Sequence, residues 1–327
     1  MIPIRDTLTS RNRPVVNQSI IAVNVLVYLL QSAQGADLNR FIYVYGLVPA
    51  RYAVPEFAEY FSGFQQVFAF LSFMFLHGGF WHLAGNMWSL WIFGDNVEDQ
   101  LGPLRYLLFY LLCGICSGLA HMVLNLHSNV PTIGASGAIS GVMGAYMLLH
   151  PNARILTLIP IIIFPWFVEI PAFFFLGLWF LLQFLNAAGS AGAVTGVAWW
   201  AHIGGFVCGM LFLKLFKQIP HAGISQRVRP MTTRKTSPRL QMVRPVATGA
   251  DAHTYGTLTL TPYEAAVGAQ KTVNVPWGFQ KRLVRVNVPP GIAEGKSLRL
   301  QGMGKISAGG ARGDLFLKIK IRGPLEK

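Results

Sequence analysis

Six long apolar runs constrain this chain more than any other feature. An α-helix needs roughly 20 such residues to cross the hydrocarbon core of a bilayer. The runs lie at residues 17–34, 80–97, 103–126, 135–150, 155–186 and 196–216. The fifth is long and is broken by three prolines, and a further apolar stretch at 53–76 carries acidic and amide residues that favour an interfacial loop with short helices. The sequence therefore predicts a polytopic α-helical membrane protein with six spans.

Charge divides the chain into two parts. Seven Lys or Arg and eight Asp or Glu precede residue 214, whereas 20 basic and five acidic residues follow from Lys214 onward. The net charge of +14 at pH 7 therefore belongs to the C-terminal part. With 53% hydrophobic and only 12% charged residues, the whole chain is too apolar for an ordinary soluble protein. We expect one module in lipid and one in water.

The basic residues that flank the spans predict their orientation, because such residues are retained in the cytoplasm. Three arginines precede the first span and Lys214 and Lys217 end the last one, whereas the loops at 127–134 and 187–195 contain neither Lys nor Arg. With six spans, both chain ends then lie in the cytoplasm. The N-terminal region also lacks the pattern of a cleaved signal peptide. We expect an integral protein of the plasma (inner) membrane.

Four polar side chains inside the spans fall at similar depth. His82 and Asn86 are four residues apart and share one helix face near the start of the second span. Ser136 opens the fourth span, and His202 lies in the first third of the sixth. All three spans run inward from the outer side in the orientation above, so the four residues lie in the outer half of the membrane. Because polar and ionisable groups are costly in a bilayer, each is a candidate functional residue.

Together these residue types can perform nucleophilic acyl transfer. A serine hydroxyl needs a base within hydrogen-bond reach, and the oxyanion that develops on the attacked carbonyl needs hydrogen-bond donors. Ser136 and His202 can supply the nucleophile and the base, while His82 and Asn86, with the Ser136 backbone N–H, can supply the oxyanion site. No carboxylate is placed to orient His202, so we expect a dyad, with neither a metal nor a cofactor.

Ser136 also has a purely structural interpretation, because small residues four apart allow close helix contact in lipid. Two stripes of this kind are present, Gly137, Gly141 and Ala145 on the fourth span and Ala201, Gly205 and Gly209 on the sixth. Contact between the two stripes would itself bring His202 to Ser136, so packing and catalysis are compatible. Gly134 additionally leaves room for a peptide carbonyl beside the hydroxyl.

The segments HGGFWHLAGNMWSLWIFG, EDQLGPLRY, GASGAISG and AHIGGFVCG, in this order, resemble the rhomboid family of intramembrane serine proteases. The resemblance covers roughly residues 15–216. It implies a compact six-helix bundle with a water-filled cavity that opens outward, and it gives the four polar residues the roles assigned above. It also implies that Glu98 and Arg105 lie in the short loop after the second span, and that residues 35–79 form a lipid-embedded first loop.

One position departs from the family pattern. Rhomboids often carry an aromatic residue one turn after the nucleophile, where it stacks on the catalytic histidine. This chain has Ser140 there. The orientation of His202 is therefore open, with Trp199 and Trp200 as candidate partners.

The C-terminal part contains a second pattern. Residues 217–252 are rich in basic, Pro and Ser/Thr residues, which is typical of a flexible linker. Alternating apolar residues then predict strands at 257–260, 271–275, 282–288, 297–301 and 314–321. The segments TPYEAAVGAQKTVNV and VNVPPGIAEGKSLRLQGMG resemble the client-binding C-terminal β-domain of DnaJ-type co-chaperones. No J domain or cysteine-rich zinc module accompanies it, so we do not expect stimulation of an Hsp70.

The sequence thus predicts a rhomboid-like protease domain at 1–216, a basic linker at 217–252 and a DnaJ C-terminal-like β-sandwich at 253–327. We expect a serine endopeptidase that cleaves single-span membrane proteins within the lipid bilayer. The β-domain would hold unfolded or cytosolic polypeptide segments. We expect no nucleic-acid binding, since no stacking aromatic residues interleave with the basic residues of the linker. The alternatives are an inactive rhomboid-like protein that binds membrane clients and a small transporter or channel.

Overall fold

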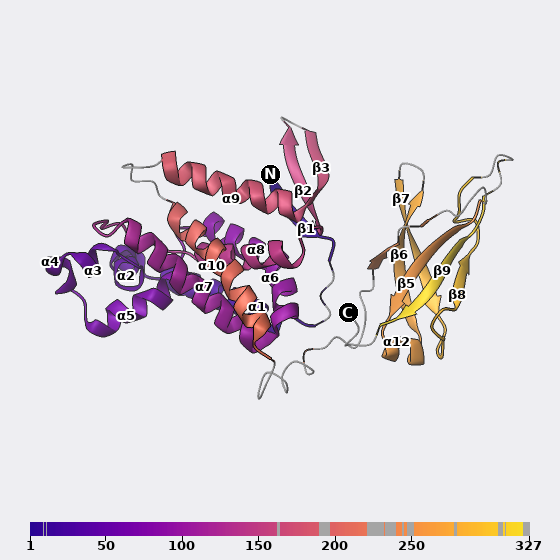
Figure 1. Ribbon diagram of the computed structural model, residues 1–327, viewed down its shortest axis with the longest axis horizontal. Coiled ribbons are helices and arrows are strands. Elements are labelled where there is room, and N and C mark those ends of the chain that lie inside the picture. The colour runs from indigo at the N-terminus through magenta and orange to yellow at the C-terminus, as the bar shows by residue number, and fades with distance from the viewer. Residues whose placement is uncertain are drawn as a thin grey trace. The chain divides into compact units, whose positions relative to one another are not determined.

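The computed structural model divides into two compact units, Met1–Thr232 and Thr233–Lys327, which are drawn in Figure 1. It describes residues 1–322 except 9, 11, 162–163, 190–196, 221–231, 233–239, 244, 247–251, 278–279, 307–309 and 311. Most of the predicted linker at 217–252 lies outside the described residues.

The first unit is a helical bundle. Its longer helices are α1 (Val15–Ser32), α6 (Phe80–Leu101), α7 (Pro103–Leu124), α8 (Ser136–Leu149), α9 (Ala172–Gly189) and α10 (Trp199–Gln218). Short helices connect α1 to α6, namely η1 (Gly35–Asp37), α2 (Leu38–Tyr45), α3 (Ala50–Ala53), α4 (Pro55–Ala58), α5 (Gly63–Ser72) and η2 (Phe73–Phe75). The stretch at 53–76 thus consists largely of short helices, as predicted.

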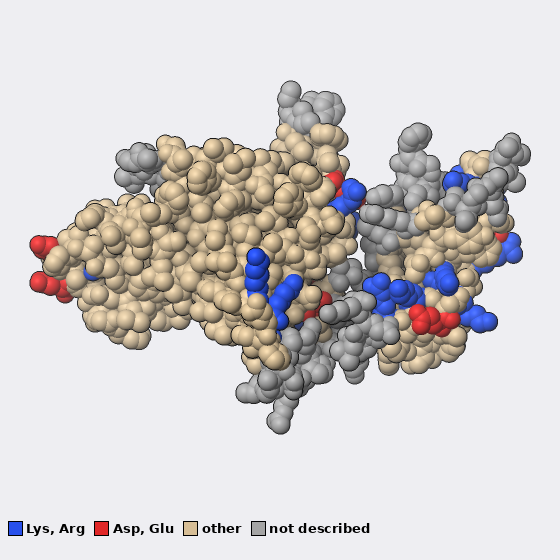
Figure 2. Space-filling view, viewed as in Figure 1, with Lys and Arg blue, Asp and Glu red and all other residues tan. Residues whose placement is uncertain are grey.

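Four of the described helices are long and apolar enough to cross a membrane, namely α1, α7, α9 and α10. A fifth span results if α5–η2 and α6, which are bent by 78° relative to each other, are taken together. The 14 residues of α8 extend only about 21 Å, less than the hydrocarbon core of about 30 Å. Figure 2 shows that the visible face of this unit is largely free of charged side chains.

The predicted fifth span at 155–186 is wrong in its first half. Its described residues up to 171 form an antiparallel pair of strands, β2 (Arg154–Ile161) and β3 (Phe164–Pro171), and the helix begins only at Ala172. Proline lacks the N–H group that a helix interior requires, and β-branched residues favour strands, so the prolines and isoleucines of this stretch favour the two strands. A strand near the N-terminus, β1 (Ile2–Asp6), pairs antiparallel with β2 and completes a sheet of order β1-β2-β3.

Glu98 and Arg105 lie on helices and not in a loop, which corrects that expectation. Only Gly102 separates α6 from α7, and its φ of 81° suits glycine. The Glu98 carboxylate on α6 accepts two backbone N–H groups at the start of α1, at 2.7 and 3.1 Å. Arg105 on α7 donates to the carbonyl oxygens of Ile219 and Pro220, just past the end of α10. Both side chains therefore cap helix ends that would otherwise have unpaired backbone groups.

The second unit is a small β-sheet domain. Its strands are β4 (Leu240–Met242), β5 (Thr254–Leu260), β6 (Ala269–Trp277), β7 (Gln280–Val288), β8 (Ser297–Leu300) and β9 (Leu315–Ile321), with a short helix α12 (Pro262–Val267) after β5. They form two three-stranded sheets, β4-β6-β7 and β5-β9-β8. Alternate residues such as Val273, Leu258 and Leu317 from both sheets meet in one buried core. All five predicted strands are present.

Candidate active site

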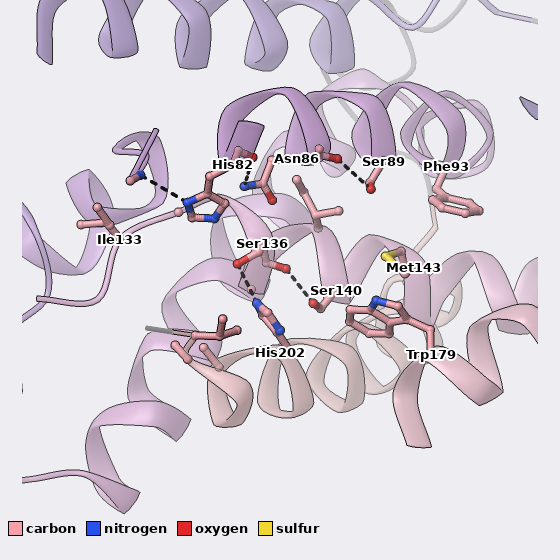
Figure 3. A pocket seen from close by; sticks show the side chains of 18 of the residues that line it. His82, Asn86, Ser89, Phe93, Ile133, Ser136, Ser140, Met143, Trp179 and His202 are labelled. Carbon is pink, nitrogen blue, oxygen red and sulfur yellow. Dashed lines mark hydrogen bonds between the residues drawn. The ribbon is translucent and has the colours of Figure 1, made fainter. Parts of the chain in front are cut away.

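Ser136 and His202 are in direct contact. Ser136 is the first residue of α8, and His202 lies in the first turn of α10. The Ser136 Oγ and His202 Nε2 atoms are 2.8 Å apart. A dashed line marks this contact in Figure 3. The separation is a hydrogen-bond distance, so the hydroxyl can donate its proton directly to the imidazole.

Glycines allow Ser136 and His202 to meet, because they let α8 and α10 pack closely together. A Cβ atom at Gly205 would lie 2.0 Å from the carbonyl oxygen of Gly137, and one at Gly209 would lie 2.1 Å from that of Gly141. Side chains at these positions would therefore push the two helices apart. The two small-residue stripes face each other in the structure, with the serine and the histidine near one end of the contact.

Gln183 on α9 holds the other side of the imidazole, and the sequence analysis missed it. Its Oε1 atom is 2.8 Å from His202 Nδ1, and its Nε2 atom donates to the backbone carbonyl of Trp179. With an amide oxygen as acceptor, Nδ1 carries the proton, and Nε2 is left to accept the proton of Ser136. A signal was available, since Gln183 is the only amide or charged residue between Ala172 and Leu185, and intramembrane polar groups are functional candidates.

Trp179, also on α9, supplies the aromatic contact that position 140 lacks. Its ring centroid lies 6.0 Å from that of His202 at an interplanar angle of 35°, and Trp199 meets the same imidazole edge-on at 6.1 Å. Ser140 is only 1% exposed, and its hydroxyl donates to the backbone carbonyl of Ser136 at 2.6 Å. The orientation of His202 thus comes mainly from α9, with Trp199 as one of the two tryptophans that the sequence suggested.

Ser136 and His202 line a cavity of about 650 Å³. Its walls are formed by α6, α8, α9 and α10, and by the segment around Ile133 that leads into α8. Figure 3 shows His82 and Asn86 across this space from the serine and the histidine. The structure therefore brings all four sequence-predicted residues to one cavity.

His82 and Asn86 are placed to donate toward an oxyanion. His82 Nδ1 accepts the backbone N–H of Gly78 at 3.2 Å, which leaves the proton on Nε2. A Cβ atom at Gly134, whose φ is 130°, would lie 3.0 Å from His82 Nε2 and 3.6 Å from Ser136 Oγ. The space that the glycine leaves open is thus within reach of both the hydroxyl and the imidazole.

Asn86 and the start of α8 provide further donors. Asn86 Nδ2 donates one hydrogen bond to the backbone carbonyl of His82 at 2.9 Å, and an amide nitrogen has a second N–H to offer. The first backbone N–H groups of α8 have no intrahelical acceptors, and a helix N-terminus carries partial positive charge. Together these groups can stabilise negative charge beside Ser136. Among the described residues, no group of three or more His, Cys, Asp or Glu is placed to hold a metal ion.

Two known protein families match parts of this chain. A family profile described as "Rhomboid domain" matches residues 65–218, a range that contains His82, Asn86, Ser136 and His202. A second one, described as "DnaJ C terminal domain", matches residues 254–325. The chain is a rhomboid-family protein with a DnaJ C-terminal-like domain.

Curated relatives agree with this assignment. "Rhomboid protein 1, mitochondrial" of Saccharomyces cerevisiae is 30% identical over 201 residues, which cover 59% of this chain and 51% of the yeast protein. "Rhomboid protease GluP" of Bacillus subtilis is 32% identical over 142 residues, 43% of this chain and 26% of that protein. "Presenilin-associated rhomboid-like protein, mitochondrial" of Mus musculus is 30% identical over 144 residues, 42% of this chain and 35% of the relative. The chain therefore matches about half of the length of the yeast relative and less of the other two.

Proposed function

We propose that this rhomboid-family protein is an intramembrane serine endopeptidase. The observation that carries the proposal is the 2.8 Å contact between Ser136 Oγ and His202 Nε2, with Gln183 holding the opposite imidazole nitrogen. Nucleophile, base and orienting group form the arrangement by which serine hydrolases activate their hydroxyl. Here an amide takes the place of the carboxylate of a triad.

The reaction follows from these positions. Ser136 Oγ attacks a peptide carbonyl while His202 Nε2 takes its proton, and the carbonyl oxygen becomes an oxyanion close to His82 and Asn86. His202 then returns the proton to the leaving amine, so that the C–N bond breaks and an acyl-serine remains. A water molecule, deprotonated by the same imidazole, hydrolyses this ester and restores the hydroxyl.

The position of Ser136 supports a membrane protein as substrate. Because α8 is about 9 Å shorter than the hydrocarbon core, a nucleophile at its first residue can lie below the membrane surface. A transmembrane helix hides its carbonyl groups in its own hydrogen bonds, so the substrate must unwind locally to present one. We therefore propose a single-span protein whose helix unwinds near the outer face.

The membrane arrangement is part of the proposal. Counting α6 and α8 with the four long apolar helices gives six spans, both chain ends in the cytoplasm and a cavity that opens to the outer face. Basic residues at the end of α10 support this orientation, since Lys214 and Lys217 lie there. We place the chain in the plasma (inner) membrane; two relatives are named mitochondrial, and cell fractionation decides between these locations.

The test is cleavage of a single-span reporter by the purified full-length protein in proteoliposomes. Ser136→Ala and His202→Ala should each lower the rate by at least about 1,000-fold. A fluorophosphonate should label the parent on Ser136 and should not label Ser136→Ala. Equal cleavage by the parent and by Ser136→Ala would exclude the mechanism, and a folded parent that neither cleaves nor becomes labelled would favour the client-binding alternative.

For the β-sheet domain we propose a role in holding cytosolic segments of substrates. The supporting observation is that α12 presents two large apolar side chains to solvent, because Tyr263 and Val267 are each 54% exposed. Removing residues 245–327 should change the ranking of substrates that differ in their cytosolic tails, while Ser136 stays reactive toward the fluorophosphonate. An unchanged ranking would exclude this role.

A further inference from the structure

The strand β1 reaches the cavity that contains the serine and the histidine. Met1 and Pro3 line this cavity together with Trp179 of α9 and Ser89 of α6. In Figure 1 the chain end marked N lies beside α9. The N-terminal segment therefore occupies space between two helices that form opposite walls of the cavity.

β1 is held there mainly by its backbone. It pairs antiparallel with β2, with Ile2 opposite Leu158 and Asp6 opposite Ile155. Because the strand order is β1-β2-β3, β1 covers the edge of β2 that faces away from β3. Without β1, that edge would present unpaired N–H and C=O groups, which readily accept another extended chain.

Two side-chain contacts fasten β1 to the helices. Trp88 Nε1 on α6 donates to the Pro3 carbonyl oxygen at 2.6 Å. The Asp6 carboxylate accepts from Asn96 of α6 at 2.9 Å and from the Tyr146 hydroxyl of α8 at 2.6 Å. Burial raises the pKa of Asp6 to about 6, so this carboxylate is poorly solvated and depends on these donors.

The apolar part of the contact is small. Met1 is 51% exposed and Ile2 is 49% exposed, so β1 contributes little buried surface. Backbone pairing with a few polar contacts is largely independent of side-chain identity. Another extended apolar segment can therefore make the same pairing.

We propose that the edge of β2, together with the adjoining side of α6, is a docking surface for an extended segment of a membrane-protein substrate, and that β1 occupies it until the substrate displaces it. This inference rests on the proposed function. The reason is continuity, because one cavity runs from Ser136 to Pro3. The cavity extends from Ser136, at the outer end of α8, toward β1, which contacts Tyr146 near the inner end of the same helix. The part of the substrate that leads inward from the unwound peptide bond therefore lies in this cavity, where its backbone needs hydrogen-bond partners.

The experiment locks β1 in place. Ile2 and Leu158 are directly paired across the two strands, so the double variant Ile2→Cys, Leu158→Cys can form a cross-strand disulfide. The control is Leu158→Cys, Phe167→Cys, which joins β2 to β3 at another direct pair and leaves β1 free. The single variants show whether the native thiols Cys113, Cys116 and Cys208 take part.

In the full-length protein, the oxidised β1 lock should lower cleavage of a single-span reporter by about tenfold or more, and dithiothreitol should restore it. The oxidised control should cleave within about twofold of its reduced form. Fluorophosphonate labelling of Ser136 should persist in both, which separates a blocked surface from a misfolded protein. Cleavage by the fully oxidised β1 lock at the reduced rate would overturn the proposal.

Binding gives a readout that does not require catalysis. In a Ser136→Ala background, the reduced β1 lock should retain the reporter in detergent about tenfold better than the oxidised form. Equal retention would overturn the docking surface even if the protein is no protease. Trp88→Phe, which removes the donor to Pro3, should raise cleavage by about twofold, whereas Trp91→Phe on the same helix should not. A Trp88→Phe rate at or below that of the parent would contradict displacement of β1.

Discussion

Two helices hold His202 from opposite sides, and they are built differently. On α8, which supplies Ser136, ten of 14 residues are buried. On α9, which supplies Gln183 and Trp179, only five of 18 are buried, and large apolar side chains such as Phe174 are exposed. Ser136, the proposed nucleophile, therefore lies on a tightly packed element, whereas the groups that orient His202 lie on a helix that packs loosely.

This difference assigns two requirements of the site to different helices: α8 fixes the distance between Ser136 and His202, and α9 orients the imidazole. Close packing fixes the distance between α8 and α10, because a core without free space has few alternative arrangements. α9 forms a wall of the cavity and also orients His202, since Phe175, Trp179 and Gln183 all project from it. A movement of α9 would therefore change access to the cavity and alignment of the base together.

The largest effect should come from the tight contact. In Gly205→Ala the new methyl group would lie 2.0 Å from the carbonyl oxygen of Gly137, so α8 and α10 must separate. A displacement of about 1 Å at a catalytic pair costs about 100-fold, and we expect fluorophosphonate labelling of Ser136 to fall by at least that factor. The matched control is Gly177→Ala on α9, where a Cβ atom would meet nothing within 4 Å. Equal labelling of the two variants would contradict the difference between the helices.

The same contrast explains what the sequence could reveal. On α8 and α10 the small residues recur every fourth position, and this periodicity predicts which faces meet and that Ser136 and His202 approach. The family, the helical membrane domain and the β-sheet domain were also predicted, and the comparisons and the fold confirm them. Such patterns are local, so they can be read without knowing the rest of the fold.

The region from 154 to 189 was predicted less well, for a physical reason. Its residues are apolar almost throughout, so no periodicity distinguishes helix from strand or one helix face from another. β2 pairs with β1, which lies about 150 residues earlier in the chain, and no local pattern reveals such a partner. Gln183 was detectable as a lone polar residue, but its contact with His202 depends on how α9 packs.

A smaller effect should follow from removing the orienting amide. Gln183→Leu leaves Nδ1 of His202 without its acceptor, and we expect kcat to fall by about 10- to 100-fold with little change in KM, because substrate contacts are untouched. Gln183→Glu keeps an oxygen at the same position and should recover most of the loss. Cleavage kinetics of the single-span reporter measure both values.

Asn186→Leu is the control for that substitution. Asn186 lies on the same helix and has the same chemistry, but it is exposed and its amide bonds to the backbone carbonyl of Leu182. Its replacement should change kcat by less than about twofold. If the Gln183→Leu variant cleaved the reporter as fast as Asn186→Leu, then α8 and α10 alone would align His202, and α9 would not be needed for its orientation.

The smallest effects compare Trp179, which supplies an aromatic contact to His202, with Ser140, which occupies the position where an aromatic residue was expected. Trp179→Leu removes a ring contact with His202 from the loosely packed helix, and about a three- to tenfold loss of kcat is expected. Ser140→Ala removes a hydroxyl that donates to the carbonyl one turn earlier on α8, a contact that contributes little to a helix. Its kcat should stay within about twofold of the parent. The reverse ranking in reporter cleavage would mean that α8 orients His202. In that case α9 would be only a wall of the cavity.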